Sequence, residues 1–253
     1  MKDSHIDLLA TLFCGQCFGW KEEQGVFQSV VNGRLITFTE DTFLATLAGN
    51  GDLIRYFDMD GEYEMAKAHL RKLDPTMAKA VDRFAGLHIL NQDPWEVLVC
   101  FILSQNNNIA RIRQMYCRLT EAYGSPVGAG WHSFPTAAQM QDVSEEDLRR
   151  LGMGFRAPYL LDAIAQNSLL EEIPSLPFDE ALHHLMTIRG VGPKVGQCIL
   201  LYGFHRMEAF PMDTWMKKIM LRWYPTKDSQ YFAPYAGLAQ QYLFHYARTE
   251  APV

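Results

Sequence analysis

The 253-residue sequence has no long hydrophobic run and no low-complexity tract. Its longest uninterrupted apolar stretch, Val97 to Leu103, is far shorter than the roughly 20 residues needed to cross a bilayer. The N-terminus carries Asp3 and Asp7 where a secretory signal would need a basic start and an apolar segment. We therefore expect a soluble protein with no membrane partner, located inside the cell.

Cysteine is also scarce, with five residues in an odd count that does not suit a disulfide framework. A reducing environment is the better expectation for a chain of this length. Cys14 and Cys17 form one C-x-x-C pair, but the other three cysteines lie singly, so no second pair completes a zinc site. We expect two small, half-buried residues beside a turn here, with a metal or redox role as the weaker alternative.

The chain lacks the positive net charge that is common among nucleic-acid-binding proteins, since its formal charge is −6. The charge is unevenly distributed, however. Residues 181–223 hold six bases against two acids, and residues 102–125 hold three bases against one acid. Such basic segments can bind a polyanion while the rest of the surface stays acidic. Solvated helix faces would give the same pattern, so charge alone decides nothing.

The pattern predicts an α+β fold that is mostly α. Two β-rich segments, Val26 to Val31 and Arg34 to Phe38, flank Asn32-Gly33, which is typical of a two-residue hairpin turn. From Asp93-Pro94 onward nearly everything reads as helix, starting with Pro94 in a first helical turn. We predict a small antiparallel β domain with helices over residues 1–90 and a larger helical domain over 91–253. The further helices that we expect cover residues 109–123, 144–151, 158–167, 179–187, 194–202, 214–222 and 235–246.

The most informative segment places Gly190-Val-Gly-Pro193 between two apolar-faced helices, the second of which opens at Lys194. Two glycines let the backbone turn tightly and approach another molecule, and the proline suits the first helical turn. The unpaired N–H groups at the start of the second helix attract anions. Gly190, Gly192 and Val195 are therefore candidates for contacts with a DNA backbone. A plain glycine-capped turn is the alternative.

Lys194 and Asp213 are the candidate catalytic pair. An amine at a helix N-terminus has its protonated form disfavoured by the helix dipole and by desolvation, which is one way in which a lysine becomes a nucleophile. Asp213 precedes the next predicted helix, where it would act at least as an N-cap. A cap also fixes the carboxylate where it could face a developing cation.

These residues resemble a known superfamily. Ile188-Arg-Gly-Val-Gly-Pro-Lys-Val195 followed by Pro211-Met-Asp213 is similar to the helix-hairpin-helix, Gly/Pro-rich loop and aspartate of base-excision DNA glycosylases. A lysine at position 194 marks the bifunctional glycosylase/lyases, and the four closely spaced cysteines of the iron–sulfur members are missing after Cys198. The 8-oxoguanine DNA glycosylases are similar over nearly the whole chain. Their signature stretches match residues 15–20, 106–111, 151–156 and 234–240.

The resemblance implies roles for single residues. Lys194 would attack C1′ of the damaged nucleotide, while Asp213 would stabilise the sugar cation. The substrate-binding residues would be Gly15, Cys198, Gln240 and Phe244. The Gly15 carbonyl would accept the N7–H of the lesion, which guanine lacks because its N7 is an acceptor. Gln240 would bond the pairing edge of the base, and Phe244 and Cys198 would press on its two faces.

The resemblance also implies a pocket for the orphaned cytosine and a wedge that fills the gap in the duplex. Asn106, Arg111 and Arg156 would hold the cytosine, and Phe155 would be the wedge. Three positions depart from the better-known eukaryotic pattern. Phe155 replaces a tyrosine, Trp215 replaces a phosphate-contacting histidine, and Gly19 stands where an arginine is common. Opposite-base selection should therefore be weaker than in the full family pattern.

No cofactor is expected, although a structural cation at the hairpin carbonyls of Met186, Ile188 and Val191 is left open. The expected partner is double-stranded DNA containing oxidised guanine, bound by a monomer. The expected location is intracellular and DNA-associated, in the cytoplasm or nucleoid if the source is bacterial. The resemblance implies DNA repair by 8-oxoguanine excision with AP lyase activity. The alternatives are a bifunctional glycosylase for another oxidised base and a non-catalytic helix-hairpin-helix module.

Overall fold

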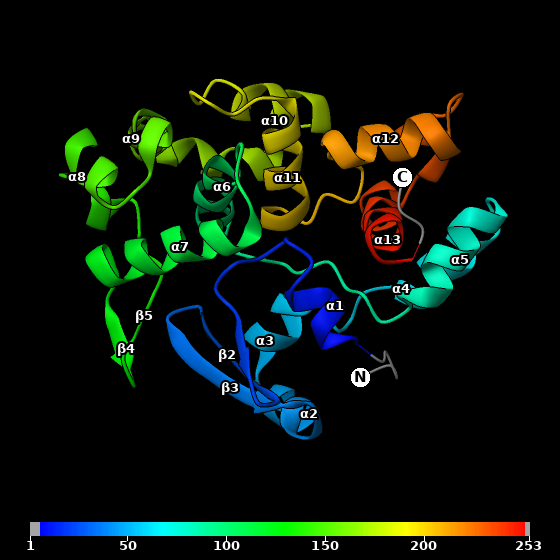
Figure 1. Ribbon diagram of the computed structural model, residues 1–253, viewed down its shortest axis with the longest axis horizontal. Coiled ribbons are helices and arrows are strands. Elements are labelled where there is room, and N and C mark those ends of the chain that lie inside the picture. The colour runs from blue at the N-terminus through cyan, green and yellow to red at the C-terminus, as the bar shows by residue number, and fades with distance from the viewer. Residues whose placement is uncertain (1–5, 251–253) are drawn as a thin grey trace.

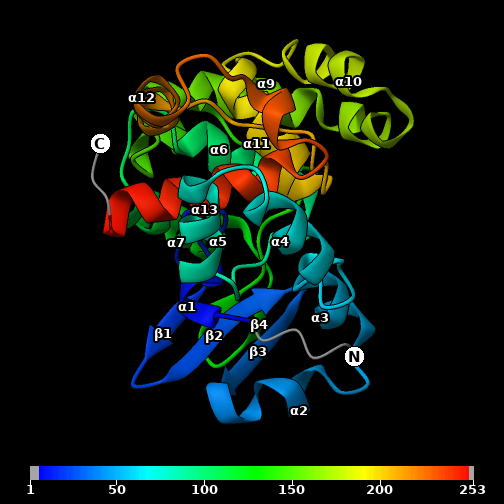
Figure 2. The ribbon, with the colours of Figure 1, turned by 90° about the vertical axis from the view of Figure 1, so that its right-hand side faces the viewer.

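The computed structural model describes residues 6–250 and has an antiparallel sheet near the N-terminus beneath a helical body (Figure 2). The sheet has the order β1 (Lys21–Glu23), β2 (Val26–Val31), β3 (Arg34–Thr39). Val31 pairs with Arg34 across the turn, where Asn32 and Gly33 have φ of 49° and 72°. Positive φ at both central positions is the type I′ geometry that Asn-Gly favours. The predicted hairpin is confirmed.

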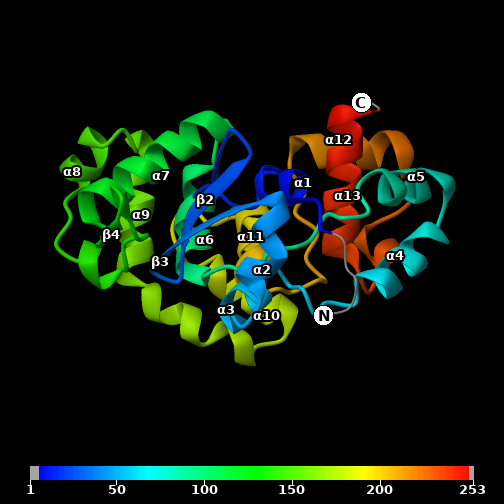
Figure 3. The same ribbon diagram turned by 90° about the horizontal axis from the view of Figure 1, so that it is seen from below.

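One face of this sheet is buried beneath short helices. Burial alternates along β2, as expected for a half-buried strand, and Phe27 stacks on Phe38. The core of the sheet also contains Trp20 and Phe57. Three helices border this core: α1 (Leu8–Leu12), α2 (Phe43–Leu47) and α3 (Gly51–Tyr56), which Figure 3 shows beside the sheet. The loop that carries Gly15 leaves α1 toward the helical body.

The larger core is helical and is centred on two packed helices, α6 (Pro94–Leu103) and α11 (Pro193–Gly203). Every residue from Val97 to Leu103 is buried. An all-round apolar helix belongs in an interior, which accounts for the longest apolar run in the sequence. The other helices of this part are α7 (Ile109–Tyr123), α8 (Glu145–Arg150), α9 (Ala157–Ala165), α10 (Phe178–Leu185), α12 (Thr214–Trp223) and α13 (Ala236–Thr249). Each predicted helix is present, with ends shifted by at most three residues.

The first third of the chain also contributes to the helical body. Helices α4 (Tyr63–Arg71) and α5 (Pro75–Arg83) lie beside α13 at the right of Figure 1 and share its core. The division of the chain at residues 90 and 91 therefore stays a prediction. Short 3-10 turns connect the elements: η1 (Glu40–Thr42), η2 (Ala138–Met140), η3 (Gly154–Arg156), η4 (Asn167–Glu171), η5 (Ile173–Ser175) and η6 (Ser229–Phe232).

The sequence pattern missed a second, small hairpin, β4 (Pro126–Gly128) with β5 (Trp131–His132). Its turn uses positive φ at Gly128, Ala129 and Gly130. The strands are too short to show an alternating apolar pattern, which is why the sequence did not predict them. Among the described residues, no helix combines the length and the apolar character that a membrane span requires.

Candidate active site

The loop between α10 and α11 is held by α9. Gly190 has φ of +85°, and a Cβ built there would lie 2.5 Å from the Tyr159 ring, so only glycine fits. Asp162 accepts a 2.6 Å hydrogen bond from the Arg189 N–H, and the Ile188 carbonyl accepts one from Val191 at 3.0 Å. The predicted hairpin is therefore a rigid turn fastened to the neighbouring helix.

The other glycine of the hairpin faces open space. Gly192 is the N-cap of α11 in an extended conformation, and nothing lies within 4 Å of a Cβ built there. Pro193 occupies the first turn, as predicted, and no side chain caps the helix. The N–H groups of Lys194 and Val195 in the first turn are thus available to an external acceptor. This is the geometry of a phosphate site.

Lys194 lies half-buried, with its Nζ 5.1 Å from the centre of the Phe101 ring. One turn later, Cys198 is buried, and burial raises the pKa of its thiol to about 11, although the nearby Lys194 charge acts in the opposite direction. Asp213 is the N-cap of α12 and accepts a 2.7 Å hydrogen bond from the Met216 N–H. The predicted capping role of Asp213 is confirmed, and it fixes the carboxylate.

Lys194 and Asp213 line one cavity of about 380 Å³. All six residues proposed for catalysis and base binding contribute to its wall: Lys194, Asp213, Gly15, Cys198, Gln240 and Phe244. They come from the loop after α1, from α11, from the start of α12 and from α13. A volume of this size suits one nucleobase or a molecule of similar size.

The loop that carries Gly15 is anchored by its neighbour Gln16. The Gln16 amide donates to the carbonyls of Thr11 and His88, and its oxygen accepts from the Leu90 N–H at 2.9 Å. Gly15 itself has φ of +96°. Within residues 6–250, no donor reaches its carbonyl. Gly15, with its unbonded carbonyl, therefore lies on an anchored loop at the cavity wall.

Gln240 and Phe244 lie one turn apart on α13, as predicted. Gln240 is 4% exposed. Phe244 is half-buried, with the Arg248 guanidinium 5.2 Å from its ring centre. Arg248 and Trp215 also line the cavity, and Trp215 is 37% exposed. An amide, an aromatic ring and a cation thus line the same cavity as Gly15.

The structure brings together the residues proposed for the opposite base. Asn106 has φ of +49° and lies just before α7, and its carbonyl accepts from Arg156 at 3.3 Å. Arg156 is 2% exposed and also donates to the Gln105 carbonyl, while burial and the Arg111 charge lower its pKa. The Phe155 ring is 46% exposed, with the Arg156 guanidinium 4.3 Å from its centre. An exposed aromatic ring on a 3-10 turn is suited to inserting between bases.

Sequence reasoning missed the residues that hold this site in place. Tyr159 and Asp162 fix the hairpin, and Gln16 fixes the Gly15 loop. Only the position of Gln16 within the stretch from Gly15 to Trp20 offered any signal. Their roles depend on contacts between residues 27 to 74 positions apart, which local patterns do not encode.

Cys14 and Cys17 are 6% and 3% exposed, so they are more deeply buried than the half-buried pair that the sequence predicted. Both thiols are buried and donate to the carbonyls of Thr11 and Leu12, and burial raises the pKa of Cys14 to about 11. A thiol that stays protonated is a poor nucleophile and a poor metal ligand. In the described part of the chain, no group of three or more His, Cys, Asp or Glu side chains could hold a metal ion.

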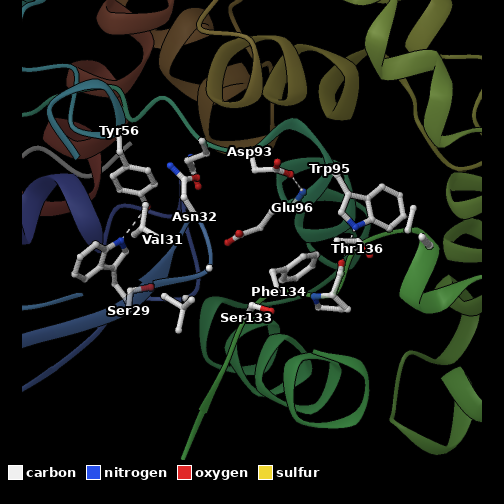
Figure 4. Close-up of a pocket in the computed structure, with 18 of the residues that line it drawn as sticks. Ser29, Val31, Asn32, Tyr56, Asp93, Trp95, Glu96, Ser133, Phe134 and Thr136 are labelled. Atoms are coloured by element: carbon white, nitrogen blue, oxygen red, sulfur yellow. Dashed lines mark hydrogen bonds between the residues drawn. The ribbon is translucent and has the colours of Figure 1, made fainter. Parts of the chain in front are cut away.

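A second cavity, of about 340 Å³, lies between the β2–β3 hairpin and the start of α6. Figure 4 shows the Glu96 carboxylate pointing into it between Tyr56 and Phe134. Asp93 and Trp95 also line it, and none of its lining residues is a lysine, arginine or histidine. Burial, and then the Asp93 charge, raise the pKa of Glu96 to about 8.

Comparison with known proteins agrees with this arrangement. A family model described as the 8-oxoguanine DNA glycosylase N-terminal domain matches residues 1–98, and one described as the HhH-GPD superfamily base excision DNA repair protein matches residues 99–233. A structure of 8-oxoguanine glycosylase/lyase from Clostridium acetobutylicum, in complex with double-stranded DNA containing cytosine opposite to 8-oxoG, is 32% identical. It superposes with a TM-score of 0.84 over 97% of this chain and 92% of that one.

Two curated relatives match over smaller shares of their own length. The N-glycosylase/DNA lyase OGG1 of Arabidopsis thaliana is 28% identical over 85% of this chain and 66% of that protein. The N-glycosylase/DNA lyase of Saccharomyces cerevisiae is 35% identical over 55% of this chain and 42% of that protein. The chain belongs to the HhH-GPD superfamily of base excision DNA repair proteins and, within it, to the 8-oxoguanine DNA glycosylases.

Proposed function

We propose that the chain is a bifunctional DNA glycosylase and AP lyase that excises 8-oxoguanine from duplex DNA. The observation that carries this proposal is the single cavity whose wall holds an amine, a carboxylate, a free main-chain carbonyl and a base-sized opening. The hairpin of Gly190 and Gly192 lies at the start of the helix that carries Lys194. One rigid unit therefore holds the DNA backbone and places the nucleophile.

The chemistry follows from these positions. A damaged nucleotide is extruded from the stack into the cavity, because its C1′ atom cannot be reached within the duplex. The Lys194 amine attacks C1′ as the bond from C1′ to the base breaks, and the base leaves after taking up a proton. Asp213 stabilises the positive charge that develops on the sugar. The amine and the opened sugar then form a Schiff base, and loss of a C2′ proton expels the 3′ phosphate.

Base selection rests on the Gly15 carbonyl. Oxidation at C8 places a hydrogen on N7, which turns that atom from an acceptor into a donor. The rigid Gly15 loop offers an acceptor to this hydrogen, whereas guanine would bring two acceptors together. An unsatisfied pair of this kind costs roughly 1–3 kcal/mol.

A panel of duplexes tests this proposal, each with one lesion: 8-oxoguanine, an oxidised pyrimidine, an alkylated purine or plain guanine. We expect rapid release of 8-oxoguanine and a covalent adduct on borohydride treatment. Faster release of an oxidised pyrimidine would favour a different bifunctional specificity. Binding without release or adduct would make the chain a passive helix-hairpin-helix module. Action on DNA would place the protein on the nucleoid in a bacterial cell.

A further inference from the structure

The orientation of the Gln240 side-chain amide is set by its sequence neighbour. The Gln241 Nε2 donates to the Gln240 Oε1 at 2.7 Å. On the other side, the Gln240 Nε2 lies 3.5 Å from the Pro211 carbonyl. Both glutamines are 4% exposed and both line the cavity of Lys194. The two contacts favour the same orientation of the Gln240 amide, with its oxygen toward Gln241 and its nitrogen toward the Pro211 carbonyl.

Gln241 is held in turn by α11. Its Nε2 also donates to the Tyr202 hydroxyl, and the Tyr202 ring stacks on Phe101 at 5.4 Å and 16°. The Gln241 Oε1 is buried without a partner in the described part of the chain. If the Gln241 amide turned over alone, its oxygen would face the Gln240 oxygen, and if both amides turned over, the Gln240 oxygen would face the Pro211 carbonyl. Tyr202 and Gln241 therefore form a lock on the Gln240 amide.

The amide orientation matters because purines differ at the same two atoms of their pairing edge. A 6-oxopurine presents an acceptor at position 6 and a donor at N1, whereas a 6-aminopurine presents a donor at position 6 and an acceptor at N1. A single amide matches the first edge in one orientation and the second edge in the other. An amide that can turn over would therefore bind both classes of purine. An amide held in one orientation would distinguish a 6-oxopurine from a 6-aminopurine.

Building on the proposed function, we propose that Gln241 and Tyr202 are positioning residues that make the Gln240 amide selective for oxidised 6-oxopurines over oxidised 6-aminopurines. Neither residue needs to contact the base. Their effect passes through one hydrogen bond to the Gln240 oxygen.

The test compares single-turnover release of 8-oxohypoxanthine and 8-oxoadenine, which share N7–H and differ at position 6 and N1. We expect wild type to prefer 8-oxohypoxanthine. Gln241→Met keeps the side-chain length but removes the hydrogen bonds, and it should reduce this preference by about tenfold. Gln241→Glu offers only acceptors once it is ionised, so above the pKa of that carboxyl it should turn the Gln240 amide over and favour 8-oxoadenine. Unchanged ratios in both variants would overturn the proposal.

Two further measurements distinguish a loss of base selectivity from misfolding of the variant. Borohydride trapping on DNA with a preformed abasic site needs no base recognition, so it should be unchanged in a folded variant. If the Gln241 variants fail this check, Tyr202→Phe carries the test, since it keeps the stacked ring and removes only the hydroxyl that anchors the lock. An unaltered ratio in Tyr202→Phe would then count against the proposal. Gln230→Met, at an exposed position on η6, is the matched control.

Failure of the proposed function has a different signature. In that case wild type would not release 8-oxoguanine, or would release an oxidised pyrimidine faster than 8-oxoguanine. Release of 8-oxohypoxanthine and 8-oxoadenine by wild type at equal rates would leave 8-oxopurine excision intact and refute the lock alone.

Discussion

Two cavities of similar volume lie at opposite ends of the same central helix and differ in charge. The N-terminal end of α6 places Asp93 and Glu96 in a cavity without a single basic side chain. The C-terminal end places Phe101 in a cavity that contains Lys194 and Arg248 beside the carboxylate of Asp213. The second cavity can attract a polyanion, whereas the first offers it no cation. Local placement of charge, rather than the net charge of −6, therefore decides which cavity can face DNA.

Of the variants in the two cavities, removal of the Lys194 amine should reduce base release the most. Lys194→Gln should reduce base release by on the order of 10³-fold or more, because the nucleophile is removed. DNA binding should persist, since the backbone contacts of the hairpin remain. Single-turnover release and a gel-shift titration measure the two quantities. Strand cleavage at the wild-type rate would refute the assignment of Lys194.

Asp213→Asn should slow base release by roughly 10²–10³-fold, because a neutral amide cannot stabilise a cationic sugar as a carboxylate does. Asparagine is as good an N-cap as aspartate, so α12 should stay folded. The variant thus separates the effect of the Asp213 charge on base release from its effect as the N-cap of α12. A wild-type rate together with a wild-type melting temperature would leave Asp213 with the capping role only.

Arg156→Ala should weaken the preference for cytosine opposite the lesion by about tenfold, because Arg156 donates to the Asn106 carbonyl and so supports the turn on which the proposed cytosine pocket depends. Release of 8-oxoguanine opposite each of the four bases measures this preference. Arg149→Ala, on the exposed face of α8, is the control. A preference that survives in Arg156→Ala would show that the orphan-base pocket lies elsewhere.

The smallest effect on base release is expected at the acidic cavity, where a change should alter stability alone. Folding raises the pKa of Glu96 from 4.5 to about 8, so the folded protein keeps a proton that the unfolded chain releases. The contribution of Glu96 to stability is therefore complete below pH 4.5 and is lost as the pH rises toward 8. Glu96→Gln should remove on the order of 1–3 kcal/mol of this pH dependence between pH 5 and 8.

Urea unfolding at several pH values measures this dependence, with the exposed Glu121→Gln as control. Base release should be unchanged, since Glu96 lies outside the cavity of Lys194. An identical pH slope in wild type and Glu96→Gln would contradict the assigned environment of Glu96.

The sequence predicted the parts of this molecule that rest on local rules. The Asn32-Gly33 turn, Pro193 in the first turn of α11 and the Asp213 cap each follow from the conformational preference of one residue or a pair. The candidate site residues came from a resemblance in motif order. The structure adds that six of them share one cavity.

The supporting contacts could not be predicted from the sequence. Gln16 reaches the 88–90 segment across more than 70 positions, and Asp162 reaches the hairpin across 27. From its sequence neighbours, Glu96 is predicted to be an exposed acidic residue in the first turn of a helix. Its burial depends on the hairpin and on the segment around Phe134. The contacts of Gln16, Asp162 and Glu96 all depend on tertiary packing, which no local sequence pattern encodes.

The most direct test of the central claim is to map the covalent adduct. Wild-type protein would be reduced with borohydride during its reaction with an 8-oxoguanine duplex, digested, and sequenced by mass spectrometry. The cavity geometry predicts a sugar remnant on Lys194 alone. A remnant on the nearby exposed Lys217 or Lys218, or no remnant despite base release, would contradict Lys194 as the nucleophile.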